Sequence, residues 1–363
     1  MSEQQQGVAQ MTLASRYYTD AAIFEREKEA IFYRSWQYAG HLAQIPERGD
    51  YFTLQIADEP LLVIRGEGGA VRCFYNVCKH RAHQLLSDSG NARIIACPYH
   101  AWSYRSDGSL KRAPHSEKTA GFEREKICLT AVRVELLGGF IFINLDPDAA
   151  PMAEWYPQMA EQLRDYLPDF DELAPAMRVE VEEHCNWKVS VENYSECYHC
   201  PGNHPTFSNG VIEPKNYSIL PQGYCLRHRT VSAPGARMTY PVDDTRPHAR
   251  DYSSWFLWPG FSFQVYPGNL LNTYIWRPVS VRKVMVYREW FSVGGERTAV
   301  VEQLAAQDRD TTVAEDIALV ESVQRGLHSR SYRAGPLVID PASGVHSEHT
   351  IAALRDWALE ALG

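Results

Sequence analysis

The sequence predicts an α+β protein of two domains, and three observations lead to this prediction. The chain has 363 residues, which exceeds what one small hydrophobic core requires and suits two domains of ordinary size. Residues 45–146 consist of short β-rich runs and predict a small antiparallel β domain. Residues 216–300 add further strands and lead into long helical patterns, which is typical of a sheet packed against helices. We place the first domain at 41–150, the second at 151–363, and an arm and helix that pack on the second domain at 1–40.

The elements follow from local patterns. Residues 1–10 are expected to be disordered, and a helix is expected from Thr19. Runs rich in β-branched and aromatic residues predict strands at 50–56, 60–66, 70–77, 261–268, 270–276 and 283–293, and two strands within 132–145. Asp107 and Gly108 mark a hairpin turn. Helical periodicity predicts helices at 151–166, 310–327 and 350–362, while 177–187 reads as a strand turning into a further helix.

Composition narrows the class of protein. Hydrophobic residues make up 45% of the chain and charged residues 22%, as in a soluble globular protein. The net charge is −9 and no segment forms a basic stripe, so no nucleic-acid partner is expected. The sequence contains neither a long apolar run nor a secretory signal pattern, so we expect no membrane association and a cytoplasmic location. The eight cysteines are then expected to be ligands or buried thiols instead of disulfides.

Four residues of two metal-binding types, cysteine and histidine, lie close together in the first domain. Cys78 and His80 are separated from Cys97 and His100 by 16 residues. A structural zinc site could use two Cys and two His, but zinc fingers usually place two Cys on one knuckle and two His on the other. Here each knuckle carries one of each, which fits a Rieske [2Fe–2S] centre, where two Cys hold one iron and two His hold the other. The flanking residues "CKHR" and "CPYHAW" also resemble the Rieske motif, and Trp102 is expected either to cover the cluster or to be a core aromatic.

A second His-rich stretch, "ENYSECYHCPGNHP", is expected on the helix that follows residue 187. His199 and His204 are five residues apart and would not share one face of a regular helix. Pro201 and Gly202 are therefore expected to break the helix and bring His204 back. A mononuclear Fe(II) site that activates O2 needs two His and one carboxylate.

The carboxylate is expected on a distant helix that packs against the first. Asp316 is our candidate, because it lies among apolar residues in the pattern 310–327. Glu315 is the nearest alternative ligand, and a solvated Asp316 is the structural alternative.

Nearly the whole chain, from "FEREKEAIFYRSWQYAGH" at 24–41 to the last helix, resembles the oxygenase α subunit of Rieske non-haem iron oxygenases. The resemblance implies a Rieske domain beside a helix-grip (START-like) catalytic domain with an antiparallel sheet and long helices. It implies head-to-tail trimers. It also implies the ligands of both metal centres. These are Cys78, His80, Cys97 and His100 for the cluster, and His199, His204 and Asp316 for the iron.

Glu196 departs from the family pattern. Most members have Asp at this position, where it bridges a cluster His of the neighbouring subunit to an iron-ligand His. Glu here resembles the branch that oxidises carnitine, betaine and related quaternary amines, and an ordinary surface glutamate is the alternative reading. Cys197 and Cys200, which flank His199, are expected to be small buried thiols and not a third metal site.

These patterns predict a terminal monooxygenase that hydroxylates a quaternary ammonium compound, which leads to N-demethylation or, as a close second, to C–N cleavage. The alternatives are an aromatic-ring hydroxylating oxygenase that acts on an aromatic acid, and a Rieske electron-transfer protein. No G-x-G-x-x-G follows a predicted strand, so a separate NAD(P)H reductase with flavin and a [2Fe–2S] centre is expected.

Aromatic side chains are the candidates for holding the substrate, because a quaternary ammonium is bound by aromatic faces. The candidate contacts are Tyr194, Phe207, Trp258, Phe263 and Tyr266. The partner of a substrate carboxylate, such as an Arg or Asn, is left open.

Overall fold

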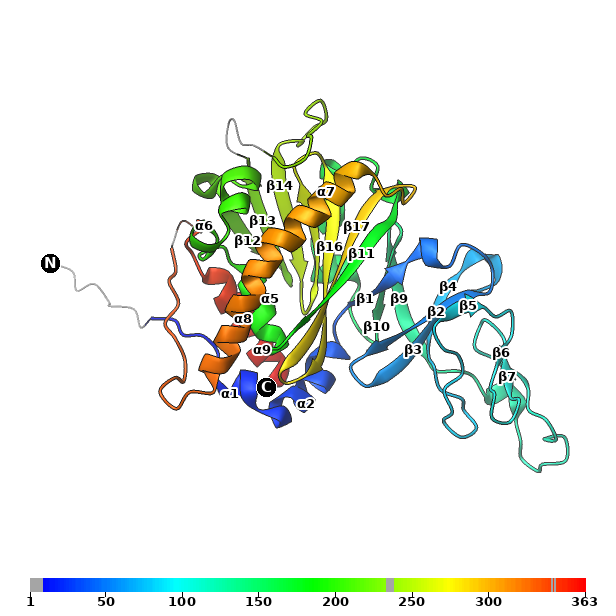
Figure 1. Ribbon diagram of the computed structural model, residues 1–363. Coiled ribbons are helices and arrows are strands. Elements are labelled where there is room, and N and C mark those ends of the chain that lie inside the picture. Colours follow the sequence, from blue (N-terminus) through cyan, green and yellow to red (C-terminus); the bar gives the residue numbers. More distant parts are fainter. Residues whose placement is uncertain (1–8, 233–237, 341, 343) are drawn as a thin grey trace. The chain divides into compact units, whose positions relative to one another are not determined.

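The computed structural model describes residues 9–232, 238–340, 342 and 344–363 (Figure 1). The expectation of disorder at 1–10 falls outside these residues except at 9 and 10, and Gln10 accepts a hydrogen bond from the Leu337 amide at 2.8 Å. The chain forms two compact units, Phe32–Met152 and the combination of Met1–Ile31 with Ala153–Gly363. None of the described helices is both long and apolar enough to cross a bilayer.

The smaller unit is an antiparallel β structure, as predicted. Its main sheet has seven strands in the order β1-β10-β9-β4-β3-β2-β5, and a second sheet has the order β6-β7-β8. The strands are β1 (Gln37–His41), β2 (Asp50–Ile56), β3 (Glu59–Arg65), β4 (Val71–Tyr75), β5 (Ser89–Asn91), β6 (Ile95–Ala96), β7 (Ser103–Tyr104), β8 (Leu110–Arg112), β9 (Ala131–Leu137) and β10 (Phe140–Asn144). The predicted hairpin turn joins β7 to β8, where the Asp107 carboxylate accepts a hydrogen bond from the Ser109 amide at 2.9 Å.

The larger unit is built on one seven-stranded antiparallel sheet with the order β11-β17-β16-β15-β14-β13-β12. Its strands are β11 (Leu173–Glu183), β12 (Ser218–Gln222), β13 (Cys225–Val231), β14 (Asp251–Leu257), β15 (Phe261–Tyr266), β16 (Leu270–Ser280) and β17 (Lys283–Val293). All of these neighbours pair antiparallel, and β14 and β15 are buried along their whole length. The core of this unit therefore lies on the middle of the sheet.

Helices cover this sheet, and Figure 1 shows α7 and α8 running across it as one long rod beside α5. The helices are α1 (Arg16–Thr19), α2 (Ala21–Glu27), α3 (Met152–Trp155), α4 (Met159–Tyr166), α5 (Trp187–Ser195), α6 (Cys200–Asn203), α7 (Ala299–Asp308), α8 (Ala314–Leu327) and α9 (His349–Leu362). Short π-helical segments are η1 (Lys28–Phe32), η6 (Phe207–Val211) and η8 (Arg309–Val313), and short 3-10 segments are η2 (Leu42–Gln44), η3 (Glu67–Gly69), η4 (Arg124–Lys126), η5 (Phe170–Glu172) and η7 (Pro214–Asn216). An antiparallel sheet with a long helix packed across it confirms the prediction of an α+β, helix-grip fold.

Two helix predictions need correction. The expected helix at 151–166 is divided into α3 and α4, because Pro157 lies between them and cannot continue a helical hydrogen-bond ladder. The expected helix at 310–327 does not begin there: its first residues belong to the π turn η8, which joins α8 to the earlier helix α7.

Glu27 on α2 anchors the start of α5. Its carboxylate is fully buried and accepts hydrogen bonds from the Lys188 ammonium at 2.5 Å and from the Trp187 indole at 2.8 Å. Burial lowers the pKa of Lys188, and the Glu27 carboxylate opposes that shift. A buried cation without its partner is costly, so α5 and the residues that follow it depend on Glu27.

We expect Glu27→Ala to lower the free energy of unfolding by about 3–5 kcal/mol, because it leaves the Lys188 charge buried and unpaired. Glu25→Ala is the matched control, since Glu25 pairs with Lys28 at 2.9 Å on the surface and should change stability by less than about 0.5 kcal/mol. Urea unfolding of the purified proteins measures both, and equal effects would contradict this role of Glu27.

Candidate active site with two metal centres

Two equivalent loops of the smaller unit carry the four predicted cluster residues. In each loop, 78–83 and 97–102, the Cys amide donates to the carbonyl five residues later, at 2.8 Å to His83 and 2.7 Å to Trp102. The alanines four residues after each Cys, Ala82 and Ala101, donate back to the Cys carbonyls at 3.0 Å and adopt φ angles of 56° and 58°. The two loops therefore fold alike and each offers one thiol and one imidazole.

The side chains of these loops fit a [2Fe–2S] cluster. The rings of His80 and His100 lie 4.6 Å apart, and both Cys78 and Cys97 are buried. Burial raises the pKa of the Cys97 thiol, and the neighbouring Cys78 adds to this shift, so a cationic partner is needed to keep Cys97 as a thiolate. His100 Nδ1 is buried without a hydrogen-bond partner. An orphaned ring nitrogen next to two buried thiols is what metal ligation requires.

Aromatic residues support the cluster loops. Trp102 stacks on His80 with ring centroids 4.7 Å apart and planes at 6°. Tyr104 is fully buried, and its hydroxyl oxygen accepts the Lys79 amide at 3.0 Å. The Tyr104 hydroxyl proton is then free to be donated to Cys78 Sγ, 3.3 Å away. A hydrogen bond to a cluster sulfur favours the more negative, reduced cluster.

We expect Tyr104→Phe to lower the midpoint potential of the cluster by about 40 mV, the one-electron equivalent of one ordinary hydrogen bond. Tyr51→Phe is the control, because the Tyr51 hydroxyl lies on the surface 3.4 Å from the Ser87 carbonyl and should leave the potential unchanged. A redox titration followed by electron paramagnetic resonance measures both. An unchanged or higher potential in Tyr104→Phe would show that its proton does not point at the sulfur.

The second His stretch does not lie on the predicted helix. Helix α5 ends at Ser195, and Glu196 is extended. His199 comes directly before the short helix α6 and His204 directly after it. Pro201 does not break a helix here: it lies in the first turn of α6, where its missing amide proton is not needed. One helical turn therefore brings the two imidazoles together.

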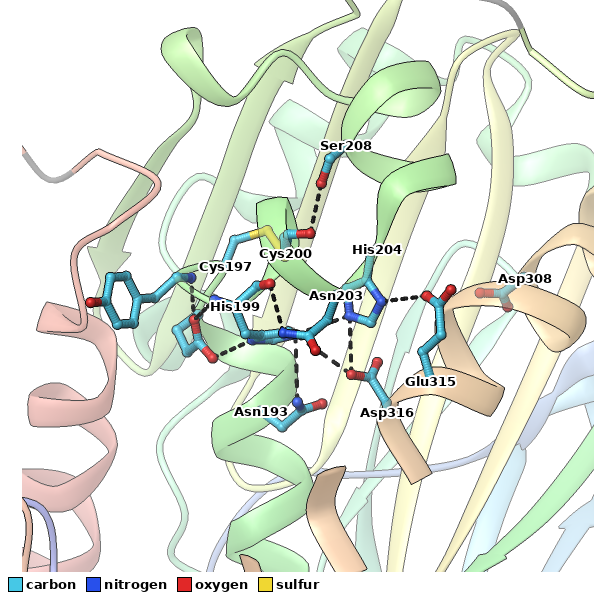
Figure 2. A network of polar contacts seen from close by, with 12 residues as sticks. Asn193, Cys197, His199, Cys200, Asn203, His204, Ser208, Asp308, Glu315 and Asp316 are labelled. Atoms are coloured by element: carbon cyan, nitrogen blue, oxygen red, sulfur yellow. Dashed lines mark hydrogen bonds and ion pairs between the residues drawn. A yellow bond between two sulfur atoms is a disulfide. The ribbon is translucent and has the colours of Figure 1, made fainter. Parts of the chain in front are cut away.

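Three donor atoms converge at this point (Figure 2). His199 Nε2 and His204 Nε2 are 3.0 Å apart. Asp316 Oδ1, from the first turn of α8, lies 3.5 Å from His199 Nε2 and 3.1 Å from His204 Nε2. The structure thus brings together the two imidazoles and the carboxylate that the sequence singled out.

The outer nitrogens of both imidazoles are held by carboxylates. His199 Nδ1 contacts Glu196 Oε1, and His204 Nδ1 lies 2.7 Å from Glu315 Oε2. Glu315, the alternative ligand, therefore faces away from the shared point and orients His204 instead. A carboxylate accepts from Nδ1–H, so each neutral imidazole carries a bare lone pair on Nε2. Two lone pairs and an anionic oxygen at such distances repel each other unless a proton or a metal ion lies among them.

Electrostatics agree with a cation at this site. Burial opposes protonation of His199, yet Asp316 and Glu196 raise the pKa of His199 to about 10. Burial would raise the pKa of Asp316, but the two imidazoles lower it. The three donors fit the two-His, one-carboxylate set that holds mononuclear iron and leaves other positions open.

Cys197 and Cys200 are buried as predicted, but they are not free thiols. The structure joins them in a disulfide. The sulfur of Cys200 lies within 4.8 Å of the nearest donor nitrogens of His199 and His204, and a disulfide sulfur is not available as a thiolate ligand. The sequence did not predict this disulfide, because two cysteines three residues apart can bond only where the chain turns between them. The chain makes such a turn just before α6.

A cavity adjoins the three donor atoms. Its wall includes Tyr194, Phe207 and Tyr266 of the sequence candidates, together with Tyr252, Gln264, Tyr274, Trp276 and Arg288. Trp258 and Phe263 lie elsewhere in the core: Trp258 contacts Trp187 and Trp357, and Phe263 contacts Phe170 and Phe261. Strand alternation could have separated them, because Gln264 and Tyr266 share one face of β15 and Phe263 points to the other.

The β unit carries two Cys and two His that fit a [2Fe–2S] cluster. The helix-grip unit carries two His and one carboxylate that fit a single iron. Together, these two sites define a Rieske-type iron oxygenase. Comparisons with known proteins bear this out. Residues 35–123 match the Rieske [2Fe-2S] domain, and residues 170–363 match the catalytic domain of the ring hydroxylating alpha subunit.

Comparison with individual relatives identifies the branch of the family to which the chain belongs. It is 36% identical over 344 residues to the carnitine monooxygenase oxygenase subunit of Acinetobacter pittii, covering 94% of this chain and 92% of the relative. It is 31% identical to the chloroplastic choline monooxygenase of Beta vulgaris, covering 93% and 76%. The structure of the quaternary ammonium Rieske monooxygenase CntA in complex with L-carnitine superposes with a TM-score of 0.84 at 34% identity, covering 97% and 95%. The chain therefore belongs to the Rieske non-haem iron oxygenases, in their quaternary ammonium branch, and the alternative of a simple electron carrier is excluded.

Proposed function

We propose that this protein is the terminal oxygenase of a two-component monooxygenase that hydroxylates a quaternary ammonium compound. The observation that carries the proposal is the convergence of His199, His204 and Asp316 on one point beside an aromatic cavity. We assign these three residues as iron ligands, and Cys78, His80, Cys97 and His100 as cluster ligands. When bound, the iron activates O2 and the cluster delivers single electrons.

The residues around the iron ligands have distinct roles. Glu196 and Glu315 hold the Nδ1 protons of His199 and His204, which fixes both rings and points Nε2 inward. Tyr194, Tyr274 and Trp276 offer aromatic faces to a cation and keep water away from it. Such walls bind an ammonium that carries methyl groups and has no N–H to donate.

The proposed reaction is hydroxylation of a methyl group next to the positive nitrogen. One oxygen atom of O2 enters the C–H bond and the other leaves as water, with two electrons and two protons supplied from outside. The resulting hemiaminal collapses to formaldehyde and the demethylated amine. Hydroxylation at a carbon further along the substrate would lead to C–N cleavage instead. The relatives named for carnitine and choline support a quaternary ammonium substrate over an aromatic acid.

We further propose that electrons come from a separate NAD(P)H reductase with flavin and a [2Fe–2S] centre, and that the protein works in the cytoplasm. The relatives' description as oxygenase subunits supports a separate reductase. In a reducing compartment the Cys197–Cys200 disulfide would be in exchange with thiols.

A head-to-tail homotrimer is the assembly that we propose. The cluster loops expose His80 and the basic residues Lys79 and Arg81. On the other unit, a hollow beside His199 is lined by Glu192, Glu196 and Glu348 together with apolar side chains. Opposite charges on the two surfaces support docking of one subunit's cluster loops at the next subunit's iron site, with Glu196 between them.

The substrate class is tested by O2 uptake with a surrogate reductase, using carnitine, glycine betaine, choline and benzoate. We expect stimulation by quaternary ammonium compounds, and stimulation by benzoate alone would overturn the proposal. Asp316→Ala should lower the iron content from about three to about two per chain and abolish turnover, because one ligand of the mononuclear iron is lost. Asp310→Ala, an exposed residue nearby paired with Arg309, should retain both iron and turnover.

Electron transfer between subunits is tested by complementation. Cys78→Ser removes a cluster ligand and Asp316→Ala an iron ligand, so each protein alone should be inactive. Mixed trimers formed by co-expression should regain about a quarter of wild-type activity, since a competent cluster precedes a competent iron at one interface in four. Mixed oligomers that remain inactive would contradict the head-to-tail arrangement.

A further inference from the structure

Arg288 is a buried cation whose hydrogen-bonding capacity is only half used. It lies on β17 with 1% of its surface exposed. Its Nη1 lies 3.1 Å from Asp308 Oδ2 and 3.3 Å from the Tyr274 hydroxyl. Its Nε and Nη2 are buried and have no acceptor among the residues that the structure describes. A guanidinium donor that is buried without an acceptor costs free energy, which indicates an acceptor that is not part of the chain.

The two unpaired nitrogens belong to the same edge of the guanidinium. Nε and Nη2 carry parallel N–H bonds, which match the two oxygens of a carboxylate. The guanidinium lies over the rings of Tyr274 and Trp290, at 5.2 and 5.3 Å, which holds its plane, while the Nε–Nη2 edge has no partner among the described residues.

Arg288 forms part of the wall of the cavity at the iron ligands. Arg288, His199, His204 and Asp316 all line it. The cavity has two other acidic wall residues: Glu196 contacts His199 Nδ1, and Glu183 accepts from the Cys185 thiol at 3.8 Å. Asp308 balances the charge of Arg288, so the pair as a whole is neutral. A ligand with no net charge, anionic at one end and cationic at the other, would leave that balance unchanged.

We propose that the Nε–Nη2 edge of Arg288 binds the carboxylate of the substrate, which makes the preferred substrate a betaine-type zwitterion. The aromatic walls take the ammonium at the other end. This inference rests on the proposed function and deepens it, because it separates carboxylate-bearing quaternary ammonium compounds from choline-like ones.

The test compares acids with their own methyl esters on the holoenzyme. Glycine betaine, carnitine and γ-butyrobetaine are each paired with the methyl ester, which keeps the ammonium and removes the negative charge. Titration calorimetry gives Kd, and O2 uptake with a surrogate reductase gives KM. We expect the wild-type protein to bind the best acid about 10- to 150-fold more tightly than its ester, the range for a charged hydrogen-bonded pair.

Variants assign this preference to one side chain. Arg288→Gln should bring the ratio of ester Kd to acid Kd close to one, and Arg288→Lys should give an intermediate ratio because it keeps the charge without the fork. The double variant Arg288→Gln with Asp308→Asn removes both charges of the buried pair, and it serves if the single variant fails to fold. Arg282→Gln, on the exposed turn before β17, should leave the ratio unchanged.

The outcomes are distinguishable. Loss of acid preference in the Arg288 variants supports the inference. Equal binding of acid and ester by the wild type, or an unchanged preference in the folded double variant, overturns it, while continued turnover of both compounds leaves the proposed function standing. Turnover of benzoate with no binding of any quaternary ammonium compound overturns both.

Discussion

The larger unit is organised around three donor atoms that repel one another unless a positive charge, from a metal ion or from protons on the imidazoles, lies among them. Two imidazole lone pairs and one carboxylate oxygen point at one another across 3.0–3.5 Å. With neutral imidazoles and no metal these contacts are unfavourable, so the rest of the unit must hold the three donors in place. Glu27 fixes the start of α5, Gln324 of α8 accepts the Asn186 amide at 2.8 Å, and α6 closes the turn between the two imidazoles. The contacts that stabilise the fold therefore also hold the donor atoms of the metal site in position.

The carboxylates outside the donor atoms are as important as the donors. Glu196 and Glu315 decide which ring nitrogen carries the proton, and this choice converts two histidines into two inward-facing ligands. Glu196 also lines a hollow together with two other acidic residues, Glu192 and Glu348.

The sequence was most informative where chemistry is encoded locally. Spacing located Cys78, His80, Cys97 and His100, and runs of β-branched and aromatic residues located β2 and β17 at the bounds that the structure shows. Asp316 was found because a carboxylate in an apolar helical pattern is unusual, although Glu315 stayed open until the structure showed its contact with His204. The role of Pro201, the start of the long rod at Ala299 and the pairing of Cys197 with Cys200 depend on contacts that no local pattern encodes. The burial and pairing of Arg288 could not be predicted for the same reason, since its partner Asp308 lies 20 residues away on another element.

The π turn η8 lies between Asp308 and Asp316, and its geometry determines the directions in which these two side chains project. Eight residues of a regular α-helix would rotate the second side chain about 80° away from the first, whereas one residue looped out in a π turn returns it to within about 20°. Asp308, the partner of Arg288, and Asp316 therefore project from the same side of one continuous helical rod, with their backbones about 10.5 Å apart along its axis. The spacing of Asp308 and Asp316 is set by the pitch of one continuous helical segment and does not depend on an irregular loop.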